Sequence, residues 1–108
     1  MNLQIETEEK EKDATLHLSG EIDAYTANQL REELIPLTEK EGTHVVVNLK
    51  NVKYMDSTGL GVFIGALKSC KKHQSSMVLT GATDRVKRLF TITGLDEVMK
   101  IKEEDWEK

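Results

Sequence analysis

A short apolar run in the middle of the chain, residues 45–49, limits the fold more than any other segment. Its sequence, Val-Val-Val-Asn-Leu, is β-branched and almost continuously apolar, which is typical of a central strand covered on both faces. A segment with helical periodicity, residues 57–73, and a second apolar run, residues 77–79, follow it. Because strand–helix–strand alternation joins parallel neighbours, the middle of the chain predicts an α/β fold.

The N-terminal part adds two strands to this predicted sheet. Apolar residues alternate with polar ones in residues 3–5 and again in residues 16–18, which indicates two half-buried strands. The charged run 8–13 is predicted to form the hairpin turn between them. The second strand is predicted to stop at Gly20. A hairpin at this end makes the sheet mixed rather than all parallel.

The C-terminal part completes a single predicted domain. Residues 98–101 are predicted to form a last strand, and the charged tail that follows contains Trp106, which we expect to dock back on the domain. The fold class is therefore α/β, a mixed β-sheet of four to five strands with helices packed on it. The domain spans residues 1–108, with its core at about 3–101, because a chain of 108 residues is too short for two cores.

Three amphipathic segments are predicted to be the helices. The first begins at an N-cap, Thr26, and ends at Gly42, and Pro36 is expected to kink it. The second spans residues 57–73 and the third residues 85–93. Apolar residues at helical spacing form the predicted buried stripes: Ala27, Leu30, Leu34 and Leu37 in the first, Leu60, Phe63, Ile64, Leu67 and Cys70 in the second, and Val86, Leu89 and Phe90 in the third.

Composition argues against several classes of function. A formal net charge of −4 disfavours a nucleic-acid-binding surface, and the one basic cluster, Arg85, Lys87 and Arg88, is expected to be a solvated helix face. No apolar run is long enough to span a membrane, and the N-terminus lacks the pattern of a signal peptide. The single cysteine, Cys70, fits a reducing compartment, so we expect a cytoplasmic protein.

The segment most informative about function is residues 56–61, Asp-Ser-Thr-Gly-Leu-Gly, at the start of the second helix. A short link through Tyr54 and Met55 joins it to the preceding strand. The hydroxyl of Ser57 therefore lies where a buried strand is followed by a helix. Helix starts have unpaired backbone N–H groups and positive dipole, so they favour negative charge. Ser57 can accordingly be a helix cap, a catalytic nucleophile or an acceptor of phosphate.

The surrounding residues argue against a catalytic serine. The nucleophile elbow of hydrolases has a glycine two residues before the serine, and Met55 stands there. A catalytic triad also needs a histidine beside the serine. His44 and His73 are predicted at the opposite edge of the sheet, and the direction of His17 is not determined by the sequence. We therefore expect no catalytic residue.

A nucleotide site has a weak motif in its favour. Gly59, Gly61 and Gly65 imitate the glycine-rich turn that follows a strand in dinucleotide-binding folds. That fingerprint also needs an acidic residue at the end of the next strand, and Thr80 stands there. The simpler interpretation is that Gly61 and Gly65 let the helix approach the sheet closely.

A metal site has two carboxylates in its favour. Asp23 and Asp56 are expected to lie close together, because both follow strands that end at one edge of the sheet. Two carboxylates and a serine supply few ligands for an oxygen-liganded cation, and no His/Cys pair has ligand spacing. We predict neither a metal nor a cofactor.

A protein-docking surface explains more of this edge. Capping of the helix by Asp56 or Ser57 is expected whatever the function. It leaves unexplained the polar loop 20–23 at the same edge and the small surface of Thr58 and Gly59, which we expect to be exposed. A flat patch of small residues suits docking by another protein better than a small-molecule pocket.

Four segments together resemble a known family. They are residues 20–23 (Gly-Glu-Ile-Asp), 45–49, 54–61 (Tyr-Met-Asp-Ser-Thr-Gly-Leu-Gly) and 89–95 (Leu-Phe-Thr-Ile-Thr-Gly-Leu), in this order within residues 3–101. They look like the anti-sigma-factor antagonists, the free-standing members of the STAS domain family. The Asp-Ser-x-Gly-Leu-Gly form is similar to that of the phosphorylatable bacterial regulators. The motifs are most similar to those of the general-stress (sigma-B) pathway of Gram-positive bacteria, and next to those of the sporulation pathway.

The resemblance implies a bacterial partner-switching protein that is not an enzyme. Its unmodified form would bind an anti-sigma factor that is also a GHKL-type serine kinase, and so free the sigma factor. The kinase would phosphorylate Ser57, and a PP2C-type phosphatase would reverse this. The family's partner-binding surface carries over to Gly20, Glu21, Asp23, Asp56, Thr58, Gly59, Leu60 and Gly61. The alternatives are a STAS scaffold subunit of a signalling complex and a nucleotide-binding or hydrolytic enzyme.

Overall fold

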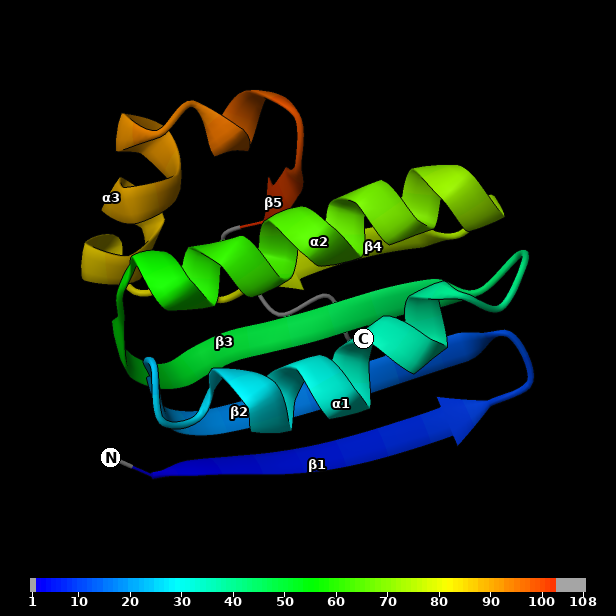
Figure 1. The fold of residues 1–108 in the computed structure, drawn as a ribbon, viewed down its shortest axis with the longest axis horizontal. Coiled ribbons are helices and arrows are strands. Elements are labelled where there is room, and N and C mark those ends of the chain that lie inside the picture. The colour runs from blue at the N-terminus through cyan, green and yellow to red at the C-terminus, as the bar shows by residue number, and fades with distance from the viewer. Residues whose placement is uncertain (1, 103–108) are drawn as a thin grey trace.

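The computed structural model describes residues 2–102, which form one sheet with helices packed against it (Figure 1). The elements in chain order are β1 (Leu3–Lys10), β2 (Asp13–Ile22), α1 (Ala27–Thr38), β3 (His44–Met55), α2 (Ser57–His73), β4 (Ser76–Thr80), α3 (Asp84–Ile92), a 3-10 turn η1 (Leu95–Glu97) and β5 (Lys100–Lys102). The bounds of α2 agree with the predicted helix, and the 3-10 turn was not predicted.

The five strands follow one another across the sheet in the order β1-β2-β3-β4-β5. β1 pairs antiparallel with β2, and all later neighbours are parallel, which confirms the predicted mixed sheet. β2 and β3 end level with each other, because Ile22 pairs with Met55. Both strands therefore reach the same edge of the sheet just before a helix begins.

The two long helices, α1 and α2, lie on the same face of the sheet (Figure 1). α3 packs against β3, and its Phe90 ring meets the Phe63 ring of α2 edge to face with the centroids 6.1 Å apart. α1 and α2 cover one face of β3, and on the other face Asn48 is also buried, at 3% exposed. The register pairs Asn48 with His17, so the one polar residue of the apolar run marks the face turned away from the helices.

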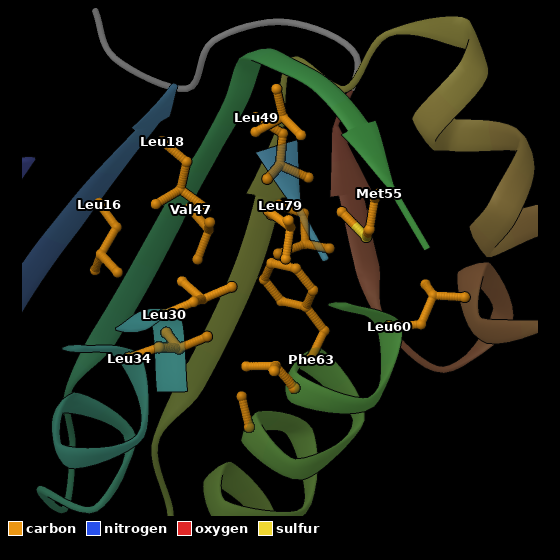
Figure 2. Packing of buried hydrophobic residues seen from close by; sticks show 14 of the residues in the cluster. Leu16, Leu18, Leu30, Leu34, Val47, Leu49, Met55, Leu60, Phe63 and Leu79 are labelled. Atoms are coloured by element: carbon orange, nitrogen blue, oxygen red, sulfur yellow. The ribbon is translucent and has the colours of Figure 1, made fainter. Parts of the chain in front are cut away.

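The core fills the layer between the sheet and these helices. Side chains from the sheet, among them Leu16, Val47 and Leu79, point toward α1 and α2 (Figure 2). Most of the predicted stripes are buried: Ala27, Leu30, Leu34, Leu37, Leu60, Phe63, Cys70, Val86 and Phe90. Ile64, Leu67 and Leu89 are only partly buried and pack against the outside of this cluster. Buried apolar residues of the described chain form one continuous cluster, and their burial stabilises the packing of the helices on the sheet.

Several element boundaries differ from the predictions, among them those of α3, predicted at residues 85–93, and β5, predicted at residues 98–101. The hairpin turn is limited to two residues, so β1 and β2 extend into the charged run, and β2 continues through Gly20 to Ile22. β3 has 12 residues and includes Tyr54 and Met55, which were predicted to be a link. α1 ends at Thr38, two residues after Pro36, rather than at Gly42. Backbone pairing with neighbouring strands extends an element beyond its apolar run, and this pairing has no local sequence signal.

A different glycine from those predicted lets α2 approach the sheet. A Cβ atom at Gly59 would lie 2.7 Å from both Ile22 Cγ2 and Met55 Cγ, whereas one at Gly61 or Gly65 would have no neighbour within 4 Å. The expectation for Gly61 and Gly65 is therefore wrong, because both face away from the sheet. Gly59, at the third position of α2, holds the first turn of the helix against the ends of β2 and β3.

The remaining sequence expectations concern the periphery. Arg85 and Arg88 are exposed on α3, as expected for a solvated face. Cys70 is buried, and burial raises the pKa of its thiol, with a smaller opposing effect of a hydrogen bond with Ser75. No helix in the described part of the chain is long and apolar enough to cross a membrane. Trp106 lies outside the described residues.

Candidate functional site

The start of α2 is formed by an aspartate that caps the helix and a serine that does not. Asp56 has an extended backbone, and its Oδ1 accepts hydrogen bonds from the backbone N–H groups of Thr58 at 2.9 Å and Gly59 at 3.3 Å. Of the two predicted N-cap residues, Asp56 rather than Ser57 therefore caps α2. Ser57 is exposed, and its hydroxyl has no hydrogen-bond partner among residues 2–102. The serine hydroxyl has no structural role that a modification would disrupt.

At the neighbouring start of α1, the side chains of Asp23 and Thr26 form hydrogen bonds with the backbone around them. Asp23 is 5% exposed, and its Oδ1 accepts from the N–H groups of Tyr25 at 2.9 Å and Thr26 at 3.1 Å. The Thr26 hydroxyl donates to the carbonyl of Glu21 at 2.8 Å and accepts from the N–H of Asp23 at 3.0 Å. Thr26 stands at the predicted N-cap position but makes no side-chain cap, because its hydroxyl is turned back toward the end of β2.

The two starts are tied together through the strands that precede them. The N–H of Asp56 donates to the carbonyl of Ile22 at 3.2 Å, so Asp23 and Asp56 directly follow two hydrogen-bonded strand ends. Gly59 packs against Ile22 and Met55 and prevents α2 from moving away. The predicted proximity of Asp23 and Asp56 at one edge is thus confirmed at the level of the backbone.

Gly20 supports the same edge from the other side. Its φ is +117°, and a Cβ atom there would lie 2.3 Å from the backbone oxygen of Asn2. The same oxygen accepts a hydrogen bond from the N–H of Glu21 at 2.8 Å. Gly20 is therefore required for the path of β2, independently of any partner.

The predicted partner surface divides into exposed and buried positions. Ser57, Thr58 and Gly61 are exposed, whereas Asp23, Gly59 and Leu60 are buried and Gly20, Glu21 and Asp56 lie between these extremes. The expectation that Gly59 is exposed is wrong, because close packing under α2 requires a buried residue without a side chain. The accessible part of the surface is smaller than predicted.

Two exposed tyrosines at this edge were missed by the sequence analysis. Tyr25 is 83% exposed in the turn before α1, and Tyr54 is 42% exposed near the end of β3. Their positions between a strand and a helix were visible, but single aromatic residues carry no signal for exposure. Both lie within three residues of Asp23 or Asp56 in the sequence.

Two carboxylates follow the adjacent strand ends at this edge. Asp23 Oδ2 is buried and has no hydrogen-bond partner among the described residues. Asp56 adds a second carboxylate at the adjacent strand end.

The arrangement does not support the enzymatic or metal alternatives. His44 begins β3 with its Nδ1 2.7 Å from Ser76 Oγ, and His73 ends α2, so both lie at the edge opposite Ser57, as predicted. His17 lies in the middle of β2, 3.8 Å from a carboxylate oxygen of Glu8. No group of three or more His, Cys, Asp or Glu residues within the described range could hold a metal ion.

Comparisons with known proteins agree on one family and one fold. Residues 4–104 match the model of the STAS domain. The chain is 50% identical to the anti-sigma-B factor antagonist of Listeria monocytogenes over 94% of this chain and 90% of that protein. It is 44% identical to the anti-sigma-B factor antagonist of Staphylococcus aureus over 95% of each.

Solved structures show the same architecture at low sequence identity. The anti-sigma factor antagonist SpoIIAA in its unphosphorylated form superimposes with a TM-score of 0.78 at 20% identity, over 94% of this chain and 90% of that one. The phosphorylated form of SpoIIAA, a Bacillus cell fate determinant, gives a TM-score of 0.71 at 19% identity, over 94% and 93%. The STAS fold predicted for this chain is therefore confirmed.

Proposed function

The chain belongs to the STAS domain family and is an anti-sigma factor antagonist, and we propose that phosphorylation of Ser57 switches it from a binding to a non-binding form. The observation that carries this proposal is the free hydroxyl of Ser57. It is exposed at a helix start that Asp56 already caps, so its modification breaks no hydrogen bond of the fold.

The domain can accept a phosphate at this position without unfolding. A phosphate adds about −1.5 to −2 charges at neutral pH, and the positive end of α2 favours negative charge. SpoIIAA, which has the same fold, has been solved in both unphosphorylated and phosphorylated forms. The effect of the phosphate is therefore expected on partner binding rather than on folding.

The effect on binding follows from the charge of the edge. A phosphate on Ser57 would stand next to Asp56 and add to the negative charge that a partner surface meets at this edge. A repulsive contact with a like charge at about 4 Å, at an effective dielectric constant of about 20, costs about 4 kcal/mol. Half of that energy would weaken partner binding by more than tenfold, since about 1.4 kcal/mol corresponds to a factor of ten.

The partners in this proposal are two enzymes of opposite effect. One is an anti-sigma factor with GHKL-type serine kinase activity, whose bound ATP donates its γ-phosphate to Ser57 Oγ with release of ADP. The other is a PP2C-type phosphatase that hydrolyses the phosphoserine. We propose a regulator that acts in the cytoplasm without catalytic activity of its own, and the names of the relatives support the sigma-B pathway.

The proposal is tested by comparing three variants with the anti-sigma factor of the same bacterium and ATP. Ser57→Ala should bind the anti-sigma factor and accept no phosphate, because the acceptor oxygen is gone. Thr58→Ala is the matched control, since it removes the adjacent exposed hydroxyl, and it should be phosphorylated as the wild type is. Ser57→Asp should keep the circular dichroism of the wild type and bind at least tenfold more weakly.

Phosphate incorporation is measured by intact-mass spectrometry and the modified residue by peptide mapping. Phosphorylation of Ser57→Ala at the wild-type level, or its loss in Thr58→Ala alone, would reject Ser57 as the acceptor. Undiminished binding of both phosphorylated wild type and Ser57→Asp would reject the switch.

A further inference from the structure

The tyrosine in the turn before α1 has no evident role in the fold. Tyr25 is 83% exposed, the largest exposed fraction among the exposed large hydrophobic residues of the described chain. We propose that Tyr25 is the anchoring residue of the interface with the anti-sigma factor, an inference that rests on the proposed function. Its ring would insert into an apolar pocket of the partner, and Ser57 would control access to the same surface.

Exposure of this ring is unusual for the chain because its aromatic residues are few. Aromatic residues make up 5% of the sequence, and both phenylalanines are fully buried in the core. Both tyrosines, in contrast, lie at the edge that carries Ser57, because Tyr54 pairs with Glu21 one position before the strand ends. Single exposed apolar residues are common on protein surfaces, but tyrosine is among the residue types enriched in binding hot spots.

The backbone that carries Tyr25 is held in one conformation before any partner binds. Asp23 Oδ1 accepts a hydrogen bond from the N–H of Tyr25, and the Thr26 hydroxyl donates one to the carbonyl of Glu21. The N–H of Ala27 donates to the carbonyl of Asp23 at 2.9 Å. A tyrosine has only two rotatable side-chain bonds, so a ring on a fixed backbone loses little entropy when it is buried.

The turn lies on the same edge as Ser57 and is coupled to it. Residue 25 follows the β2 end whose Ile22 carbonyl accepts the N–H of Asp56, and Gly59 packs under both strand ends. A partner surface of ordinary size that covers one of these positions covers the other. The ring of Tyr25 would supply affinity for the anti-sigma factor, and phosphorylation of Ser57 would prevent the two proteins from making contact.

The surroundings of Tyr25 also indicate the chemistry of the pocket that receives it. Asp23 and Asp56 place two carboxylates at this edge, at the ends of β2 and β3. The complementary surface is an apolar pocket. The bulk of a phosphate on Ser57 would keep the ring of Tyr25 out of this pocket.

The test is a set of dissociation constants for the anti-sigma factor, measured by isothermal titration calorimetry with ADP present. Tyr25→Ala should weaken binding at least tenfold, and Tyr25→Phe should stay within about threefold of the wild type, because it keeps the ring. Val98→Ala is the matched control: Val98 is 54% exposed and lines a pocket with His44, at the opposite end of β3. It should bind as the wild type does, and all three variants should melt within about 2 °C of it.

The outcomes separate this inference from the proposed function when Ser57→Asp is measured in the same series. Weak binding of Ser57→Asp with wild-type binding of Tyr25→Ala would overturn the anchor and leave the switch intact. Weak binding of Tyr25→Ala with wild-type binding of both Ser57→Asp and the phosphorylated wild type would support the anchor and reject the switch. Equal losses in Tyr25→Phe and Tyr25→Ala would also overturn the anchor, because the hydroxyl rather than the ring would carry the affinity.

Discussion

The two helices that cover the sheet begin next to each other, and their starts use the same residue types in opposite ways. At α1, Asp23 and Thr26 are buried and bonded to the backbone around them. At α2, Asp56 caps the helix from a half-buried position, and the Ser57 hydroxyl faces solvent without a partner. A hydroxyl at a helix start is thus structural when the backbone of the preceding strand end supplies its hydrogen-bond partners. It is available for modification when it is exposed and has none.

Removal of each hydroxyl in turn tests whether the Thr26 hydroxyl stabilises the fold and the Ser57 hydroxyl does not. Thr26→Val keeps the shape of the side chain but leaves the Glu21 carbonyl and the Asp23 N–H without their partner, so the free energy of unfolding should fall by about 2–4 kcal/mol. Ser57→Ala should change it by less than about 0.5 kcal/mol. Urea unfolding followed by circular dichroism measures both. Comparable losses of unfolding free energy in the two variants would contradict the distinction between a structural and a free hydroxyl.

The two capping aspartates give the next largest difference. Each Oδ1 accepts two backbone N–H groups, but Asp23 is almost fully buried and Asp56 is not. Asp23→Ala should cost about 2 kcal/mol of unfolding free energy and Asp56→Ala about 1 kcal/mol, because the donors at α2 can be hydrated. The same denaturation experiment applies. A larger cost for Asp56→Ala would contradict the ranking by burial.

Gly59, in the first turn of α2, tests how closely this helix packs against the ends of β2 and β3. Gly59→Ala places a methyl group 2.7 Å from Ile22 Cγ2 and Met55 Cγ, and overpacking of this kind should exceed the gain in helix propensity, for a net loss of about 1–2 kcal/mol. The midpoint of thermal unfolding should fall accordingly. An unchanged midpoint would mean that the first turn of α2 is not held tightly against the strand ends.

The smallest effect is expected from the exposed glycines of α2. Gly61→Ala and Gly65→Ala should each raise the free energy of unfolding by about 0.5–1 kcal/mol, because nothing contacts a Cβ atom at either position. Gly61 lies one turn after Ser57 on the exposed side, so its variant should also weaken binding of the anti-sigma factor, whereas Gly65→Ala should not. Equal binding by both variants would place Gly61 outside the partner surface.

Much of the fold could be predicted from local patterns. The bounds of α2, the central position of β3 and the mixed sheet follow from periodicity and from an apolar run, because these patterns reflect which face of an element is buried. The two level strand ends that bring Asp23 and Asp56 together also followed, since parallel strands share their carboxyl edge. The extension of β3 and the early end of α1 were not predictable, because they depend on pairing and packing with distant segments.

The sequence alone determined that a serine and an aspartate begin a helix at the end of a buried strand, and its motifs indicated the family to which this combination belongs. The tertiary structure decided which of the two caps the helix, that Gly59 is a packing residue rather than a contact residue, and that Asp23 and Thr26 are occupied while Ser57 and Tyr25 are free. The physical reason is that residue types limit which hydrogen bonds and contacts can form, but burial by neighbouring elements decides which of them do.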